Sequence, residues 1–248
     1  MIMVTPANFH QDIIPINWGP IGMAMMAGDA FIAGCPITLE EAVILAPGAI
    51  IAYKGVKMKF LYLDTETTGV NPKEDSIFQI SCIYIDTEDL SNGPEEYDFK
   101  LAPYKNKGLS PMAKEKTGMT DEEINSYPSQ DLVFEEFREK ICAKVNSRDR
   151  RDKMFLLGYN ISFDDSFLRE WFSFNGDRYY GSYFWNPCID AMSLAGLRLM
   201  AARPFMHNFQ LSTVYKALTG KDLEGAHDAM SDVRATKEIF DILFSSLN

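Results

Sequence analysis

The sequence predicts an α/β domain over residues 58–248, preceded by a small β-rich extension over residues 1–57. From Met58 onward, short apolar and β-branched runs typical of strands alternate with longer runs that have helical spacing. The first 57 residues instead hold only six charged residues, and Pro and Gly break their apolar runs. With 248 residues, 46% of them hydrophobic, the chain is long enough to bury a sizeable core.

The extension is expected to consist of short strands joined by tight turns, with one brief helix over residues 38–45. A helix is expected there because Thr38 and Glu41 have the spacing of a capping box. The extension has no cluster of catalytic residue types, and its lone histidine, His10, is of a kind found more often at a surface than in a site. The role of the extension is left open between a small β module, a flap on the α/β domain and a non-essential stretch, the last because Met58 would be a sensible start.

The α/β domain contains segments typical of strands and segments typical of helices. The expected strands cover residues 59–63, 77–85, 97–101 and 154–159. The last strand is apolar throughout, which indicates burial on both faces. The expected helices cover residues 131–145, 164–174, 211–219 and 231–247. The first helix has its apolar residues at helical spacing, Gly220 ends the third, and the fourth is amphipathic.

The chain is acidic, with 24 Lys and Arg against 35 Asp and Glu, so its formal net charge is −11. This balance argues against a protein that holds nucleic acid mainly through surface cations, but not against an enzyme that meets phosphates through bound metal ions. The four cysteines lie far apart and form no zinc motif, which is typical of reduced thiols in a cytoplasmic protein. No signal peptide is expected, because the first residues lack a basic start and an unbroken apolar stretch. No membrane span is expected, because Pro and Gly interrupt the longest charge-free stretch.

The first candidate site element is the acidic pair at the end of the first strand of the α/β domain. Alternate side chains of an extended chain share a face, so Asp64 and Glu66 are expected to point the same way. Two like charges side by side are costly unless a cation joins them. Gly69 in the following turn allows close backbone approach. Seen alone, the pair is more often a solvated strand end than a site.

The second candidate element follows the buried strand at 154–159. If Asn160 and Asp164 lie on one helix, their spacing places them on the same face. Asn160 can donate to a phosphate or sugar oxygen, and Asp164 can bind a metal ion. Asp165 competes for the role of Asp164 but would lie about 100° further round the helix. Seen alone, these residues also suit an ordinary helix start.

The third candidate element precedes the last helix. His227 and Asp232 are a poor angular match on a straight helix, but their spacing works if His227 lies in the loop and the helix begins after it. A histidine titrates near neutral pH and is suited to taking a proton from water. Seen alone, the pattern is more often a capping acid beside a surface histidine.

The three elements together favour a site over these ordinary explanations. Four acids and one base are what two divalent cations need for phosphodiester hydrolysis, since carboxylate oxygens hold hard cations. Two ions about 3.5–4 Å apart can stabilise both the attacking water and the leaving oxygen.

Three segments, DTETTG at 64–69, NISFD at 160–164 and AHDAMSD at 226–232, resemble the exonuclease motifs of the DEDDh 3′–5′ exonuclease superfamily. This DnaQ-like superfamily includes the polymerase III epsilon-type proofreading exonuclease, ribonuclease T and oligoribonuclease. The resemblance covers residues 58–245, with KTGMTDEEI at 116–124 as a supporting match. It implies a ribonuclease-H-like fold, a mixed five-stranded sheet flanked by helices, and two divalent cations, Mg²⁺ or Mn²⁺.

The resemblance also implies a role for each matching residue. It makes His227 the general base that activates the attacking water. The implied metal ligands are Asp64, Glu66, Asp164 and Asp232. The implied substrate contacts are Thr67, Gly69, Val70, Asn160 and Phe163, with Val70 acting as a wedge against the last base. Tyr159 stands where the family often has histidine, which affects a substrate contact rather than the chemistry.

Surfaces beyond the site are less informative. The basic cluster at 148–153 is expected at the opposite end of the sheet from Asn160, as a solvated loop. Lysines better placed in the sequence to meet an incoming strand are Lys105, Lys107, Lys114 and Lys116. The aromatic cluster at 179–185 is expected either to stack bases or to pack as a hydrophobic flap.

The sequence therefore predicts a metal-dependent 3′–5′ exonuclease that acts on single-stranded or frayed DNA ends and releases nucleoside 5′-monophosphates. The alternatives are an RNA-trimming exoribonuclease of the ribonuclease T or oligoribonuclease kind and a non-catalytic nucleic-acid-binding module. The expected partners are single-stranded nucleic acid 3′ ends and a polymerase or other replication protein, with no membrane. The chain ends soon after its last helix, so such a protein would contact residues 1–57 or a surface of the domain.

Overall fold

The computed structural model describes the backbone of residues 42–44 and 51–53, and residues 58–89, 93–105, 107–225 and 228–245. The chain divides into two units, Met1–Val43 and Ile44–Asn248, and the five-stranded sheet with its helices belongs to the second. Most of the predicted extension, His10 included, lies outside the described residues. Its boundary at residue 57 stays a prediction.

The described part of the extension is a pair of short strands. β1 (Ala42–Ile44) pairs with β2 (Ile51–Tyr53) in a two-stranded sheet. The prediction of a helix over residues 38–45 is therefore wrong where the structure describes that segment. Val43 and Ile44 are β-branched, and this outweighs the capping-box spacing because such side chains favour an extended backbone.

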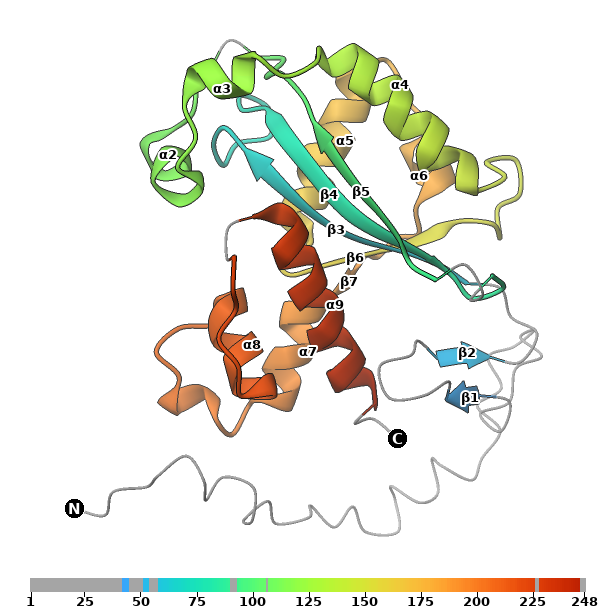
Figure 1. Ribbon diagram of the computed structural model, residues 1–248. Helices are drawn as coiled ribbons and strands as arrows, with labels where there is room; N and C mark the ends of the chain where they lie inside the picture. The colour runs from blue at the N-terminus through green and yellow to red at the C-terminus, as the bar shows by residue number, and fades with distance from the viewer. Residues whose placement is uncertain are drawn as a thin grey trace. The chain divides into compact units, whose positions relative to one another are not determined.

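The main sheet is mixed and five-stranded, as expected. Its spatial order is β5-β4-β3-β6-β7 (Figure 1). The strands are β3 (Lys59–Thr67), β4 (Ile77–Asp86), β5 (Glu95–Lys100), β6 (Met154–Gly158) and β7 (Ile189–Asp190). β3, β4 and β5 are antiparallel neighbours, whereas β6 and β7 run parallel to β3. β3 is longer than predicted, because its pairing with β4 continues through the acidic residues to Thr67.

Helices cover both faces of this sheet (Figure 1). They are α2 (Pro111–Thr117), α3 (Asp121–Asn125), α4 (Gln130–Lys140), α5 (Ser162–Phe174), α6 (Tyr180–Tyr183), α7 (Ala191–Arg198), α8 (Leu211–Thr219) and α9 (Ala229–Ser245), with 3₁₀ turns at Cys142–Lys144 and Arg203–Phe205. The helix predicted over residues 131–145 ends at Lys140, and a 3₁₀ turn completes it. Among the described residues, no helix combines the length and the apolar character that a bilayer span requires.

The alternation of side chains along β3 separates two cores. Leu61 and Leu63 pack with α4 and α5 on one face of the sheet, and Phe60 and Tyr62 pack with α9 on the other. A further cluster joins α7 and α8 to α9. β3 thus lies in the middle of the sheet, with its end held between helices from both faces.

The aromatic cluster at 179–185 belongs mostly to the core. Tyr180, Tyr183 and Phe184 are buried and pack with Phe172 of α5. The packing alternative is confirmed for these three residues, because buried rings cannot stack on bases. Tyr179 is exposed.

Candidate functional site

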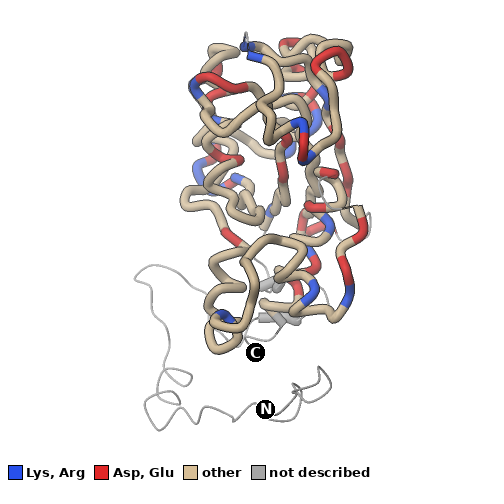
Figure 2. Tube along the Cα trace, turned by 90° about the vertical axis from the view of Figure 1, so that its left-hand side faces the viewer, with Lys and Arg blue, Asp and Glu red and all other residues tan. Residues whose placement is uncertain are grey.

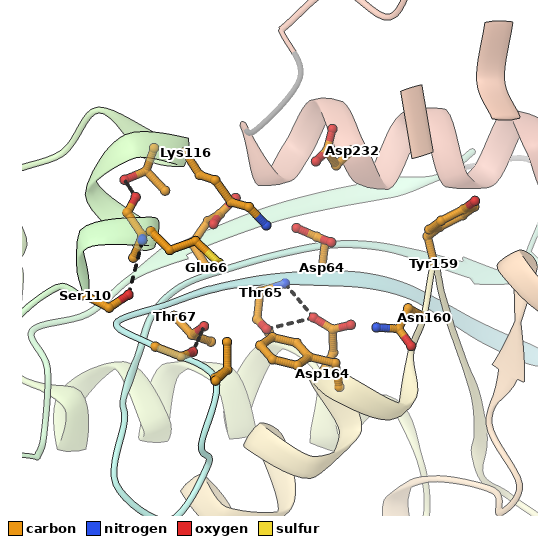
Figure 3. Close-up of a pocket in the computed structure, with 16 residues that line it drawn as sticks. Asp64, Thr65, Glu66, Thr67, Ser110, Lys116, Tyr159, Asn160, Asp164 and Asp232 are labelled. Atoms are coloured by element: carbon orange, nitrogen blue, oxygen red, sulfur yellow. Dashed lines mark hydrogen bonds between the residues drawn. The ribbon is translucent and has the colours of Figure 1, made fainter. Parts of the chain in front are cut away.

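The C-terminal half of β3 carries the first acidic pair. Asp64 pairs with Ser81 and Glu66 with Gln79 across the β3–β4 ladder. Both carboxylates have the same parity as Phe60 and Tyr62, so they lie on the face of the sheet that α9 covers. Figure 3 shows them side by side in a pocket below the start of α9.

Asp164, in the first turn of α5, is tied to β3 from the other face. Its side chain is only 3% exposed. The backbone N–H of Thr65 donates to Asp164 Oδ1 over 2.9 Å, and the Thr65 hydroxyl donates to the same oxygen over 2.7 Å (Figure 3). Thr65 has the opposite parity to Asp64 on β3. Asp164 therefore approaches the strand end from the face of the sheet opposite to α9, whereas Asp64 faces α9.

Asn160 lines the pocket from a loop position and not from the helix that its spacing predicted. α5 begins at Ser162, and Asn160 precedes it in the left-handed region, with φ of 61°. The backbone N–H of Asn160 donates to Asp190 Oδ1 over 2.9 Å. Asparagine tolerates this conformation better than most side chains. The shared helical face predicted for Asn160 and Asp164 is therefore wrong, although both residues line the pocket.

Asp165 faces away from the pocket. Its carboxylate accepts hydrogen bonds from Arg169 Nε and from the Tyr180 hydroxyl, each over 2.7 Å. Of the two acids, Asp164 therefore lines the pocket, and its role as a metal ligand stays a prediction.

Asp232, in the first turn of α9, completes the acidic group. It lies across the pocket from Asp64 (Figure 3). Its backbone N–H donates to the carbonyl of Asp228 over 3.0 Å, at the start of the helix. His227 and Ala226 lie outside the described residues, so the position of the predicted base stays a prediction.

The pocket has a volume of about 200 Å³. All the predicted site residues other than His227 line it, including Thr67, Gly69, Val70 and Phe163. Val70 stands 71% exposed at its rim. The structure thus brings together residues from β3, α5 and α9 that are far apart in the sequence.

One wall of the pocket comes from α2, which the sequence reasoning did not identify as a helix. The residues that it and its cap contribute are Ser110, Met112, Ala113, Lys116 and Thr117. Tyr159 lines the pocket as well. The Lys116 side chain points toward the carboxylates in Figure 3. The supporting match at 116–124 was the available signal, but it gave no helix and no direction for the side chain.

Burial raises the pKa values of Asp64, Glu66 and Asp164, and neighbouring carboxylates add to each shift. Burial, followed by the charges of Asp164, Glu66 and Asp232, holds the pKa of Asp64 well above its usual range. Burial and the charge of Asp232 raise the pKa of Glu66 to about 7, against a lowering effect of Lys116. Burial raises the pKa of Asp164 to about 7, although the Thr65 hydrogen bonds oppose the shift. The group is therefore costly to ionise fully without an added positive charge.

The donor set fits a hard divalent cation. Carboxylate oxygens are the ligands that Mg²⁺, Mn²⁺ and Ca²⁺ prefer, and four carboxylates line this pocket. As the side chains stand, no group of three or more acidic, His or Cys residues in the described ranges is arranged to hold a metal ion. Binding would therefore require the carboxylates to turn toward a shared ion, which would relieve their mutual repulsion.

The basic side chains identified in the sequence lie in different places in the structure. The loop at 148–153 precedes β6, whose first residue Met154 pairs with Lys59 at the start of β3. This confirms that the loop lies at the opposite end of the strands from the acidic residues. Three of the four lysines form ion pairs elsewhere, Lys105 with Glu170, Lys107 with Glu74 and Lys114 with Asp121. Only Lys116 among the four lines the pocket.

Comparisons with known proteins agree with this geometry. The RNase_T family model, described as an exonuclease, matches residues 61–240. The chain is 28% identical to DNA polymerase III PolC-type of Thermotoga petrophila over 181 residues, which are 73% of this chain and 11% of that protein. It is 30% identical to exodeoxyribonuclease I of Escherichia coli over 215 residues, 76% of this chain and 43% of the relative.

A shorter relative and a solved structure extend the comparison. Ribonuclease T of Hahella chejuensis is 27% identical over 183 residues, which cover 72% of this chain and 79% of the relative. The crystal structure of E. coli exonuclease I in complex with a dT13 oligonucleotide has a TM-score of 0.59 and 26% identity. That match covers 77% of this chain and 43% of the other. The chain thus spans less than half the length of the PolC-type and exonuclease I relatives.

Proposed function

Because the chain belongs to the exonuclease family whose model spans residues 61–240, we propose that it is a metal-dependent 3′–5′ exonuclease. It acts on single-stranded or frayed DNA ends and releases nucleoside 5′-monophosphates. The observation that supports this most is the convergence of Asp64, Glu66, Asp164 and Asp232 on one pocket. A non-catalytic binding module has no need of a buried carboxylate such as Asp64, whose pKa is raised by the charges of the other three.

In this proposal Asp64, Glu66 and Asp232 would hold one divalent cation, and Asp164, together with Asp64, would hold a second. Divalent cations bound there, Mg²⁺ or Mn²⁺, would lower the pKa of a water and offset charge on the leaving oxygen. Thr65 fixes the Asp164 carboxylate through two hydrogen bonds to Oδ1.

The remaining residues position the substrate and deprotonate the attacking water. Val70 and Phe163 offer apolar surface to the terminal bases, and the Asn160 amide can donate to a backbone oxygen. His227 is the proposed general base for the attacking water. It directly precedes Asp228, whose charge raises the pKa values of Asp64 and Glu66, so the chain next to His227 is close enough to act on the pocket.

DNA is the proposed substrate, because the matched exonuclease I structure contains a dT13 oligonucleotide. RNA trimming is the second candidate, and the ribonuclease T relative favours it. Matched DNA and RNA strands of one sequence separate the two, since kcat/KM for RNA above that for DNA would reverse the choice. The PolC-type relatives suggest a polymerase or other replication protein as a partner, which co-purification with the full chain would test.

The direct test is digestion of a 5′-labelled single strand with Mg²⁺ or Mn²⁺. We expect a ladder of strands shortened from the 3′ end, nucleoside 5′-monophosphates as products, and loss of both with EDTA. Asp64→Asn should abolish the ladder, whereas Asp149→Asn, in the loop at the other end of the sheet, should keep it. No ladder from the wild type, or equal activity in Asp64→Asn, would overturn the proposal.

A further inference from the structure

The segment 191–221 is the longest stretch of the sequence without Asp or Glu, in a chain whose net charge is −11. Its charged side chains are Arg198, Arg203, Lys216 and Lys221. The segment forms α7, the 3₁₀ turn at Arg203–Phe205 and α8. In Figure 2, the lower lobe that faces the viewer is drawn mostly in tan, whereas Asp and Glu are spread over the upper and right-hand parts.

Large apolar side chains stand exposed in the same segment. Phe205 is 86% exposed, Leu197 is 66% and Met200 is 65%. Single exposed apolar residues are ordinary on a protein surface. Three of them within nine residues, with Arg198 and Arg203 between them, combine apolar and cationic groups in one short connection. We call the connection over residues 197–209 the α7–α8 ledge.

The α7–α8 ledge is joined to the pocket by contacts. Tyr159 lines the pocket, and its hydroxyl donates to the carbonyl of Phe209 over 2.7 Å. The guanidinium of Arg203 lies over the Phe209 ring, 5.3 Å from its centroid. The charge of Arg203 also acts against the burial and the Asp190 charge that raise the pKa of Tyr159, so Arg203 lies near the pocket wall. A strand that leaves the pocket past Tyr159 would meet Phe209 and Arg203 next.

We propose that the α7–α8 ledge binds the part of a single-stranded nucleic acid that precedes the 3′-terminal nucleotide. This rests on the proposed function, which places that terminal nucleotide in the pocket. Grooves that hold single strands without reading sequence combine cations for the phosphates with aromatic faces for the bases. Arg203 and Phe205 supply one group of each kind, and no carboxylate within the segment opposes a polyanion.

Length dependence of cleavage tests the α7–α8 ledge separately from the pocket. The readout is the ratio of kcat/KM for a long oligothymidylate, about twelve nucleotides, to that for a short one of about three. Phe205→Ala should lower this ratio about tenfold, and Arg203→Gln should lower it severalfold. Phe205→Ala is the cleaner variant, because its ring is almost fully exposed.

Two matched controls remove similar groups elsewhere. Tyr179→Ala removes an aromatic side chain that is 68% exposed, and Arg151→Gln removes a cation that is 91% exposed in the loop at 148–153. Both should keep the wild-type ratio. A wild-type ratio in Phe205→Ala and Arg203→Gln, or equal losses in the two controls, would overturn the proposal.

A binding experiment keeps the inference testable if no cleavage is found. Fluorescence anisotropy of a 5′-labelled oligothymidylate, measured with Asp64→Asn protein at several salt concentrations, should show weaker binding for Phe205→Ala with the same salt slope. Arg203→Gln should reduce that slope by about 0.7, the value for one phosphate contact on a single strand. Equal affinity and equal salt slope in all variants would overturn the proposal, and a protein partner would then be the remaining explanation for this surface. If no cleavage is found but the two variants still show these changes in binding, only the proposed function is overturned.

Discussion

Asp164 and Asp165 are neighbours in the sequence with opposite surroundings. Asp164 receives two hydrogen bonds from Thr65 and lines the pocket, whereas Asp165 is held by Arg169 and Tyr180. One step along a helix turns a side chain by about 100°, which is enough to move it from the pocket into a structural ion pair. The pair therefore offers a controlled comparison of charge removal.

Asp164→Asn should lower kcat/KM about 100-fold or more, since a ligand worth several kcal/mol to the transition state is lost. Its amide oxygen can still accept from Thr65, so folding should be preserved. Asp165→Asn should keep its activity and lose about 1 kcal/mol of unfolding free energy, because Arg169 is partly exposed. Steady-state kinetics and urea unfolding measure the two effects. Equal activity losses would contradict the assignment.

The raised pKa values of Glu66 and Asp164, both about 7, make stability depend on pH. The unfolded carboxyls titrate near 4.5 and 3.8, so between those values and 7 the folded state holds more protons than the unfolded state. The free energy of unfolding should therefore fall as pH rises through this window, in the absence of divalent ions.

Urea unfolding at about pH 5 and about pH 8 checks this expectation. Glu66→Gln should show a flatter dependence than the wild type, because it removes one of the titrating groups. Mg²⁺ should stabilise the protein more at the higher pH, where protons no longer compete for the carboxylates. A slope unchanged by Glu66→Gln would show that other groups govern the pH dependence.

Lys116 faces the carboxylates, and its charge lowers the pKa of Glu66. We expect its ammonium to contact a substrate phosphate, so Lys116→Met should raise KM about tenfold and change kcat less. Lys114→Met on the same helix is the control, because the Lys114 ammonium pairs with Asp121 over 2.6 Å. Similar KM values in the two variants would remove Lys116 from the substrate site.

At the scale of elements, the turn after β3 depends on the close approach of the Gly69 backbone to the Asp75 carboxylate. A Cβ on Gly69 would lie 2.4 Å from Asp75 Oδ2. Asp75 is buried, and its carboxylate accepts from the backbone N–H of Asn71 over 2.8 Å. The turn that presents Val70 at the pocket rim is thus packed directly against this carboxylate.

Gly69→Ala should cost about 1–3 kcal/mol of unfolding free energy, since the turn or Asp75 must shift to admit the methyl group. It should also lower kcat/KM, because Val70 moves with the turn. Gly181→Ala is the control, since a Cβ there would meet no atom within 4 Å. Urea unfolding and kinetics compare the two variants. Equal free energies of unfolding would show that the turn accommodates the methyl group without destabilising the fold.

The elements themselves were predicted unevenly. The predicted bounds of α8 and the start of β4 agree with the structure, because apolar periodicity and Gly220 mark them locally. α2 has one buried residue, Ala113, so it offers almost no apolar pattern to detect. The spacing of Asn160 and Asp164 is helical, but Asn160 precedes α5, and its backbone N–H donates to Asp190 instead.

At the scale of the whole molecule, the larger sheet and its cores are built from residue 58 onward. Met58 is part of that pairing, since its N–H donates to the Thr87 hydroxyl and its carbonyl accepts from the Thr87 N–H. A chain that starts at Met58 should therefore keep the sheet intact.

Residues 58–248 should unfold cooperatively and retain kcat/KM within about twofold of the full chain. A chain that starts at Tyr62 should fail to fold, because it loses the first third of the central strand β3. Thermal unfolding and oligonucleotide digestion measure both expectations. Loss of cooperative unfolding in the chain from Met58 would show that the extension is part of the fold.

The acidic balance of the chain is partly explained by the pocket. Four of its carboxylates converge there, and two divalent cations would offset their charge. Most of the acidic excess lies elsewhere, as the spread of Asp and Glu in Figure 2 shows. The acid-free segment 191–221 is the exception to that distribution.

The sequence by itself determined the four longer strands of the main sheet, the helices α4, α5, α8 and α9, and the identity of the acidic motifs, because periodicity and short motifs are local properties. The tertiary structure decided which carboxylates share a pocket. The bond between Thr65 and Asp164 joins residues 99 apart, and the pKa shifts come from burial and from charges on separate elements. Packing over such distances also placed Lys116 in the pocket and joined Tyr159 to Phe209 of the α7–α8 ledge, and no local pattern encodes either.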